Sequence, residues 1–289
     1  MADSSHQFGG AWTEQKLGIL RKYLSAYTTV LSRAPFRTAY IDAFAGTGYR
    51  QSSASRKLKG LTELLPTRRF LDGSARVALQ CTPPFDDYVF IEKDPARCRE
   101  LEKLKREFPD KAKQISILQG DANIHIQTMC DESWVRRRAV LFLDPYGMEV
   151  SWQTIEAIAE TRAIDLWVLF PLGGVNRMLA RSGKIPSQWK HRLNELLGAT
   201  DWHLHFYQTE VSPVLFGSPI ERVVKASTQV ITDYFLTRLR GCFAGVARNP
   251  AILYNSKNSP LYLFCFAAGN PRGAPIALRI ASHILKMGS

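Results

Sequence analysis

The feature that most constrains the fold is a regular alternation of short apolar runs with helical segments. Continuously apolar runs occupy residues 38–44, 88–92, 115–119, 139–144 and 166–170. Because these runs lack the alternation of a sheet with one face in water, they are typical of parallel strands covered on both faces. Helical segments lie between them at 73–80, 95–108, 122–132 and 152–161. The alternation predicts an α/β fold with a doubly wound, mostly parallel, Rossmann-like sheet.

Both ends of the chain depart from this alternation of strands and helices. Apolar residues at three- and four-residue steps predict an amphipathic helix over 13–32. A capping box formed by Ser218 and Glu221 predicts a second helix over 218–240. The two apolar stretches that follow, 243–254 and 261–267, predict an antiparallel hairpin.

The expected organisation is an N-terminal helical extension, 1–36, followed by one α/β domain, 37–289, with insertions at 49–72 and 175–215. Long loops of this kind carry substrate contacts in α/β folds, because they lie beyond the carboxyl ends of strands. The first insertion has six basic residues against two acidic ones. We therefore expect it to contact an anionic substrate.

Composition narrows the class of protein further. The formal net charge is +12, which favours a polyanionic partner such as DNA or RNA. No apolar run approaches the roughly 18 residues of a membrane span, and no signal peptide is evident, so we expect a cytoplasmic protein without a membrane partner. The five cysteines lack zinc-binding spacing, and His203 and His205 have no evident third ligand, so no metal is expected.

The first candidate site follows the first strand, where Asp42 and Phe44 precede the pair Gly46 and Gly48. Glycine at such a turn allows a ligand to approach the backbone closely. The third glycine of a dinucleotide fingerprint and the lysine of a phosphate-binding loop are both missing. An acid followed by this turn suits a cationic nucleoside such as S-adenosylmethionine, and the alternative is a tight turn into a helix.

Acidic residues also follow the second and third strands. Glu92 is placed to accept both hydroxyls of a ribose, as in dinucleotide folds, although a surface pair with Lys93 is the alternative. Asp121, followed by Ala122, would accept the amino group of an adenine, or it would only cap the next helix.

The sharpest signal is Asp144 with Pro145 and Tyr146 after a very apolar strand. Burying a carboxylate at the end of an apolar strand costs free energy unless the carboxylate has hydrogen-bond or charge partners or takes part in function. An acid beside an aromatic ring would hold a planar amino-bearing group, and the alternative is a turn that only ends the strand. Four basic residues are candidate contacts to an anionic substrate: Arg50, Arg56, Lys57 and Arg177.

Taken in order, these motifs resemble those of class I S-adenosylmethionine-dependent methyltransferases, in particular the enzymes that methylate amino groups of nucleic-acid bases. The chain is also similar, nearly end to end, to the three-Cys-motif partner family. The similarity covers WTEQKLGILRKYL, YIDAFAGTG, GSARVAL, FIEKDPARCRELEKL, LFLDPYG, LWVLFPLGGVNRML and NSKNSPLYLF.

The resemblance implies a methyltransferase-like domain over 37–289 that binds S-adenosylmethionine without a metal. It assigns Asp42, Gly46 and Gly48 to the methionine part, Glu92 to the ribose and Asp121 to the adenine. Asp144 and Tyr146 would orient the acceptor nitrogen. It also implies a neighbouring radical-SAM-like three-Cys-motif protein as partner.

One departure from the amino-methyltransferase pattern is that Tyr146 stands where a second proline is usual, which displaces the aromatic residue by one position. The leading hypothesis is a methyltransferase of an amino nitrogen in a nucleic-acid base. The alternatives are a partner-dependent subunit that binds S-adenosylmethionine or a nucleotide, and a methyltransferase of a small molecule or protein.

Overall fold

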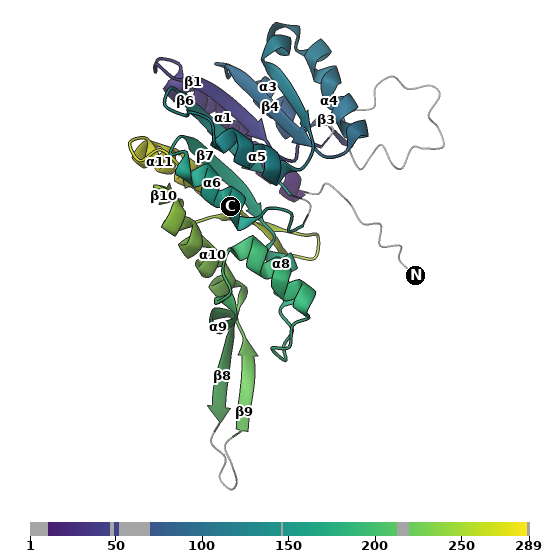
Figure 1. Cartoon of the computed structure of the whole chain (residues 1–289), viewed down its shortest axis with the longest axis vertical. Coiled ribbons are helices and arrows are strands. Elements are labelled where there is room, and N and C mark those ends of the chain that lie inside the picture. The colour runs from purple at the N-terminus through teal and green to yellow at the C-terminus, as the bar shows by residue number, and fades with distance from the viewer. Residues whose placement is uncertain (1–10, 47–48, 52–69, 146, 213–219, 288–289) are drawn as a thin grey trace, which may run out of the picture.

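The computed structural model describes residues 11–46, 49–51, 70–145, 147–212 and 220–287. Its core is an eight-stranded sheet between two layers of helices (Figure 1). Five strands are parallel: β1 (Arg37–Asp42), β4 (Asp87–Glu92), β5 (Ile115–Gln119), β6 (Arg137–Leu143) and β7 (Ile164–Phe170). The predicted parallel strands are therefore all confirmed, with ends shifted by two residues at most.

The C-terminal part completes the sheet with antiparallel strands. β12 (Pro260–Ala268) pairs with β7, and both β10 (Gly245–Val246) and β11 (Ala251–Tyr254) pair with β12. The order is β10-β12-β7-β6-β1-β4-β5, with β11 beside β12. The expected fold class is confirmed: a doubly wound, mostly parallel, Rossmann-like sheet with a C-terminal antiparallel hairpin.

Helices cover both faces of the sheet and enclose two apolar cores. One core packs under α1 (Ala11–Leu31), α3 (Ser74–Leu79), α4 (Pro95–Glu107) and α11 (Ala274–Met287). The other packs under α5 (Ala122–Cys130), α6 (Trp152–Glu160), α7 (Leu172–Met178), α8 (Ser187–Leu197), α9 (Trp202–Phe206) and α10 (Thr228–Cys242). A short 3-10 helix, Pro109–Gln114, precedes β5. Within the described residues, no helix is long and apolar enough to cross a membrane.

Two small hairpins lie outside the main sheet. β2 (Tyr49–Gln51) pairs with β3 (Phe70–Asp72), so the two ends of the 49–72 insertion lie side by side. β8 (Tyr207–Ser212) pairs with β9 (Ile220–Lys225), and this hairpin projects from the body of the protein (Figure 1).

The predicted helix over 218–240 is wrong at its start. Ile220–Lys225 forms β9, and the helix begins at Thr228 with Ser227 as its cap, whose side chain accepts a hydrogen bond from Val230 N (3.4 Å). The β-branched run in 220–225 pairs with β8, and this pairing outweighs the local capping signal. WHLHF is the helix α9, so His203 and His205, two residues apart, do not share a face.

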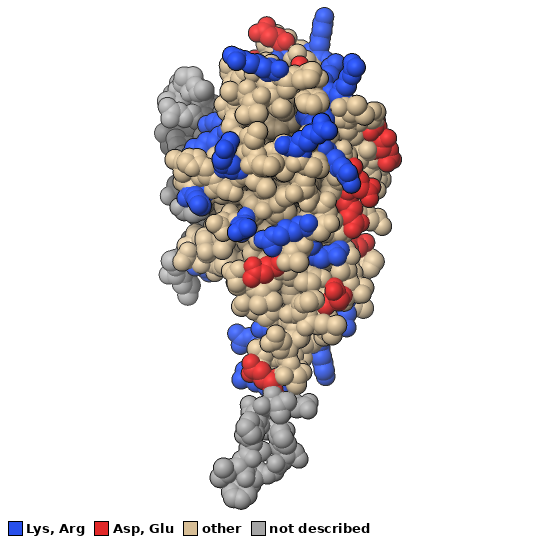
Figure 2. All heavy atoms as spheres, turned by 90° about the vertical axis from the view of Figure 1, so that its left-hand side faces the viewer, with Lys and Arg blue, Asp and Glu red and all other residues tan. Residues whose placement is uncertain are grey.

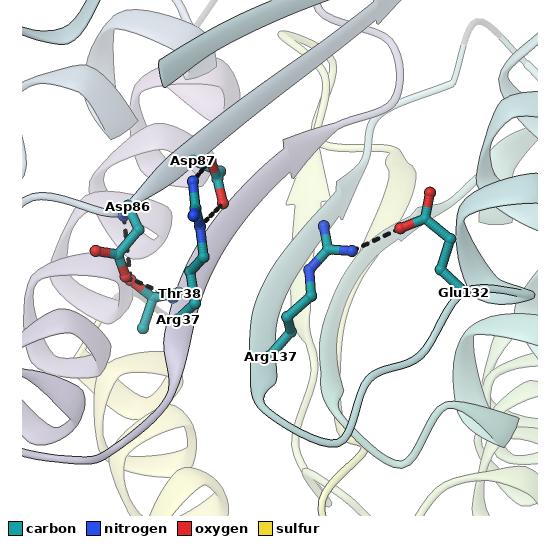
Figure 3. Close-up of polar contacts among 6 residues, drawn as sticks. All are labelled: Arg37, Thr38, Asp86, Asp87, Glu132 and Arg137. Atoms are coloured by element: carbon teal, nitrogen blue, oxygen red, sulfur yellow. Dashed lines mark hydrogen bonds and ion pairs between the residues drawn. The ribbon is translucent and has the colours of Figure 1, made fainter. Parts of the chain in front are cut away.

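Polar contacts at the amino ends of the strands fix their register (Figure 3). Arg37 forms a bidentate pair with Asp87, with distances of 2.6 and 2.7 Å, and thereby ties β1 to β4. Asp86 accepts hydrogen bonds from the Thr38 amide and hydroxyl. These contacts lie at the edge opposite the carboxyl ends, where the candidate site lies.

Replacing Gly269 by alanine is expected to destabilise the protein by at least about 3 kcal/mol, because the added Cβ would lie 2.2 Å from the backbone oxygen of Ile164. Backbone of a buried strand has little room to move. Gly241→Ala is the matched control, since its Cβ would meet nothing within 4 Å. Denaturant unfolding of both variants tests this; equal stability of the two would contradict the packing described.

Candidate functional site

The candidate site lies at the point of the sheet where the strand order reverses, between β1 and β6. β1 lies between β4 and β6, so the connections after β1 and β6 leave the sheet on opposite sides of one crevice. In open α/β sheets, ligands bind at this switch point, beyond the carboxyl ends of the strands. Asp42 ends β1, Glu92 ends β4, Asp121 follows β5 and Asp144 follows β6. The topology therefore places all four predicted acids at one edge of the sheet.

Asp42 is fully buried at this edge and is surrounded by donors. Its carboxylate accepts hydrogen bonds from Tyr40 Oη (3.3 Å), from the Phe44 amide (3.4 Å) and from the Ser74 side chain. Burial raises the pKa of Asp42 to about 7, the Ser74 hydrogen bond opposes this rise, and the nearby Asp144 adds to it. Since its oxygens are covered, direct contact between Asp42 and a cofactor stays a prediction.

The turn after β1 is held by both neighbouring strands. The Ala43 amide donates to Phe142 O and the Ala45 amide donates to Ile91 O, each at 3.1 Å. Gly46 follows with φ of +62°, and a Cβ built there would meet nothing within 4 Å. The backbone at Gly46 is thus open to an approaching ligand and has a conformation that favours glycine. Gly48 lies outside the described residues.

Glu92 and Asp121 both lie beside helix N-termini. Glu92 is 8% exposed, accepts a hydrogen bond from the Asp94 amide (2.9 Å), and has Arg97 at 3.8 Å. Asp121 caps α5, since its Oδ1 accepts from the Asn123 amide at 2.9 Å. The capping interpretation of Asp121 is thereby confirmed, and Ala122, the first residue of α5, is buried. Neither observation tests the predicted contacts to a ribose and an adenine.

Asp144 has a partner that the sequence did not reveal. Lys16 of α1 forms an ion pair with Asp144 Oδ2, and the two residues are 128 positions apart. The lysine is 4% exposed, and its ammonium lies 5.2 Å from the Trp12 ring centroid and 5.7 Å from that of Phe142. A buried ammonium requires such partners. The sequence held one indication that Lys16 is buried. It lies four residues before buried Leu20, and residues at that spacing share a helix face.

Asp144 Oδ1 accepts no hydrogen bond from the described residues, whereas Oδ2 is paired with Lys16. The Asp144 side chain is 29% exposed and Pro145 is buried. One carboxylate oxygen is therefore held by a buried cation, and the other is available to a hydrogen-bond donor at the edge of the sheet. Tyr146 lies outside the described residues.

The predicted substrate contacts are placed only in part. Arg177 is exposed on α7, which directly follows β7, so it lies beyond the carboxyl edge of the sheet. Lys225 of β9 donates to the backbone oxygen of Asn176 at 2.6 Å and thereby joins the β8–β9 hairpin to α7. The side chain of Arg50, and Arg56 and Lys57 entirely, lie outside the described residues. No group of three or more metal-ligating side chains occurs in the described part of the chain.

The described residues fit the methionine and nucleoside parts of S-adenosylmethionine. Gly46 leaves open space beside the backbone, and Glu92 presents a carboxylate at the end of the neighbouring strand. Glu92 and Asp144 each have a cation beside them, Arg97 and Lys16 respectively, and burial raises the pKa of Asp42 to about 7. The carboxylate oxygens of Glu92 and Asp144 are acceptors that suit the hydroxyl and amino donors of S-adenosylmethionine.

Comparisons with known proteins support the fold. No family model matches the chain, and no curated protein matches its sequence. Among solved structures, it is similar to protein LPL1258 from Legionella pneumophila, a DUF519 protein, with 15% identity, a TM-score of 0.53, and coverage of 97% of this chain and 93% of that chain.

Two weaker likenesses are to a putative methyltransferase from Escherichia coli and to spermidine synthase from Thermotoga maritima. The first has 14% identity and a TM-score of 0.30, and covers 71% of this chain and 87% of that chain. The second has 9% identity and a TM-score of 0.40, and covers 90% of this chain and 60% of that chain. At these identities, what the chain shares with known structures is its Rossmann-like fold.

Proposed function

We propose that this protein is an S-adenosylmethionine-dependent methyltransferase that acts on an amino nitrogen of a nucleic-acid base. The observation that carries the proposal is the placement of Asp42, Glu92 and Asp144 at the carboxyl ends of three adjacent strands, at the switch point of the sheet. The motif order shared with amino-methyltransferases and with the three-Cys-motif partner family supports the same function.

When bound, S-adenosylmethionine supplies an electrophilic methyl group on sulfur. Glu92 would accept hydrogen bonds from the ribose hydroxyls, and Asp121 would accept one from the adenine amino group through the oxygen that does not cap α5. The turn from Ala43 to Gly46, held by Asp42, gives the methionine part access to the backbone. Together these residues would hold the cofactor at the edge of the sheet where Asp144 lies.

Asp144 orients the methyl acceptor. Its Oδ1 would accept a hydrogen bond from an N–H of the acceptor amine and so hold the nitrogen in the orientation that the reaction needs. Lys16 is a positioning residue, because its ion pair with Oδ2 fixes the carboxylate in one orientation. Methyl transfer would be a single displacement, in which the N–C bond forms as the S–C bond breaks, S-adenosylhomocysteine leaves, and the nitrogen loses a proton to Asp144 or to solvent. Its rate would depend mainly on holding the two reacting atoms in line.

A nucleic-acid substrate is supported by charge. The chain has 38 lysines and arginines against 26 acids. Exposed Arg177 and Arg181 lie on and just after α7, beside the carboxyl edge of the sheet. Basic residues near the acceptor site would contact phosphates and bring the base to Asp144.

A partner-dependent binding subunit is the second candidate, and the Lys16–Asp144 pair is the observation that favours it. With Oδ2 occupied, the site offers a single acceptor oxygen, and Tyr146 replaces the usual second proline. In this alternative the chain binds S-adenosylmethionine but transfers no methyl group unless a three-Cys-motif protein is added.

Titration calorimetry with S-adenosylmethionine tests the cofactor assignment. We expect micromolar binding by the wild type and at least tenfold weaker binding by Glu92→Gln, about 1.4 kcal/mol, because a charged acceptor of the ribose is lost. Glu160→Gln, an exposed acid at the end of α6, is the matched control and should bind like the wild type. Absence of binding at millimolar cofactor would refute the proposal.

Transfer of a tritiated methyl group from S-adenosylmethionine to RNA, DNA, protein and small-molecule fractions tests the substrate. We expect incorporation into nucleic acid that falls steeply with added salt, because phosphate contacts release counterions. Incorporation into protein or small molecules alone would contradict the nucleic-acid assignment. Cofactor binding with methyl transfer only after addition of the three-Cys-motif protein would favour the second candidate.

A further inference from the structure

A cavity of about 310 Å³ lies at the opposite edge of the sheet from the candidate site. It lies between α1 and α11 and is lined by Arg138 and Asp165, each the second residue of its strand, β6 and β7. Arg138 is six residues before Asp144, so at ~3.3 Å per residue the two are roughly 20 Å apart. The cavity is therefore separate from the acceptor site, and the proposed function does not use it.

The walls of the cavity are apolar. Tyr27 and Val30 of α1 face Ile276 of α11 across it, and Phe36 lines it beside Arg138. Val30 is 50% exposed and Ile276 is 44% exposed, so apolar side chains of both helices are open to solvent beside the cavity. Mostly apolar concave sites with a few polar groups are typical of small-molecule sites.

Arg138 supplies the polar end. Its guanidinium lies 3.9 Å from the centroid of the Phe36 ring, and Nη1 donates to the backbone oxygens of Arg137 (2.6 Å) and Trp134 (3.2 Å). Nε is buried and has no hydrogen-bond partner among the described residues. An unsatisfied buried donor is costly, and an acceptor on a ligand would relieve that cost.

The net charge of the cavity is positive. Both oxygens of Asp165 are already used, by Tyr23 Oη at 2.7 Å and by the Gly269 amide at 3.1 Å. Arg272, also in the wall, forms no ion pair with any described residue. Two cations thus face one carboxylate whose acceptors are engaged.

The surroundings strengthen this positive field. Arg37 and Arg137, at the same edge of the sheet, are neutralised by Asp87 and Glu132 (Figure 3). Arg138 forms no ion pair with a carboxylate of the described residues, although Asp165 lies near enough to interact with its charge. Lysine and arginine side chains are spread over the face that carries the amino ends of the strands, while acidic side chains gather toward one edge of it (Figure 2). A field of this sign attracts anions.

We propose that the cavity between α1 and α11 binds a small amphipathic carboxylate, whose apolar body fills the space between the helices and whose anionic head pairs with Arg138. A cationic amphiphile of the same length would meet Arg138 and Arg272 and would be repelled. A neutral one, such as an alcohol, would fill the apolar space but offer Arg138 only an uncharged acceptor, which forms a weaker hydrogen bond than a carboxylate.

Calorimetric titration of the full chain with decanoate, 2-naphthoate, decanol and decylamine tests the proposal. Decanoate and 2-naphthoate distinguish an aliphatic from an aromatic body, and at least one should bind tenfold or more tightly than decanol and decylamine. Failure of both carboxylates to bind at millimolar concentration would overturn the proposal, as would equal binding of decanol.

Substitutions in the wall of the cavity test whether the carboxylate binds there. Arg138→Met should weaken carboxylate binding at least tenfold, while Arg136→Met, which removes the same charge outside the cavity, should leave it unchanged. Ala277→Trp on α11 and Val30→Trp on α1 should each block binding by filling the cavity. Because Val30 is half exposed, the second filling variant tests the site even if Ala277→Trp unfolds.

S-Adenosylmethionine titration of the same variants separates this proposal from the proposed function. We expect cofactor binding to be retained in Arg138→Met and Val30→Trp. Carboxylate binding that persists in both filling variants would place the ligand elsewhere and refute the site. Loss of carboxylate binding with intact cofactor binding supports it.

Discussion

Replacing Asp144 by asparagine is expected to abolish methyl transfer and to destabilise the protein by about 3 kcal/mol. The loss of stability arises because Lys16, 4% exposed, would be left as a buried charge without its carboxylate partner. The loss of activity arises because the acceptor amine would lose a charged hydrogen-bond acceptor. Cofactor binding should stay within severalfold of the wild type.

The double variant Lys16→Met/Asp144→Asn separates these two effects. Removing the ammonium together with its partner should restore most of the stability, since no unpaired charge stays buried. It should restore no activity. Lys16→Met alone should lower the rate of methyl transfer about 100-fold, because the carboxylate loses the contact that orients it, and should change KM little.

Thermal unfolding and single-turnover methyl transfer measure these outcomes. The matched control is Glu132→Gln, which breaks the Arg137 pair at the surface and should cost at most about 1 kcal/mol without affecting activity. Detectable methylation by Asp144→Asn with the same substrate would refute the assignment of Asp144 as a catalytic residue. A double variant as unstable as Asp144→Asn would show that the ion pair is not the source of the destabilisation.

The second large effect concerns pH and stability. Burial raises the pKa of Asp42 to about 7 and that of Asp165 to about 6, from the ordinary aspartate value of 3.8. Between a pH of 3.8 and the raised pKa of each group, the folded protein binds more protons than the unfolded chain. The free energy of unfolding contributed by these groups therefore falls as pH rises. Each group contributes a slope of up to about 1.4 kcal/mol per pH unit. Above a pH of about 7 the contribution is constant.

Asp42→Asn should flatten this dependence. Relative to the variant, the wild type should lose an amount on the order of a few kcal/mol between pH 4 and pH 7, because a buried carboxyl must ionise. Denaturant unfolding at pH 4, 5, 6 and 7 measures the difference. Asp110→Asn, an exposed acid, is the control and should follow the wild-type curve. Parallel curves for Asp42→Asn and the wild type would show that Asp42 is not perturbed by folding.

The sheet could be predicted from sequence because each strand carries its own signal. A run such as 139–144 is apolar at every position, and that pattern reports burial on both faces without knowledge of its neighbours. The position of each acid at a strand end followed directly. The structure thus bears out the placement of Asp42, Glu92 and Asp144 at one edge.

The features that escaped prediction depend on residues distant in the chain. The Lys16–Asp144 pair joins α1 to the end of β6, and nothing local to Lys16 distinguishes it from a surface lysine except its spacing from Leu20. Likewise, the capping box at 218–221 is a sound local signal, but pairing with β8 made 220–225 a strand. Tertiary pairing overrides local preference in both cases.

The connection of α1 to the rest of the protein has a consequence for synthesis. Its two buried polar contacts, Lys16 to Asp144 and Tyr23 to Asp165, span 128 and 142 residues. During synthesis, α1 therefore leaves the ribosome well before the residues that its buried face contacts. A truncated nascent chain that ends before β6 has neither contact, so the acceptor site is completed only after β6 has been made and α1 can pack against it.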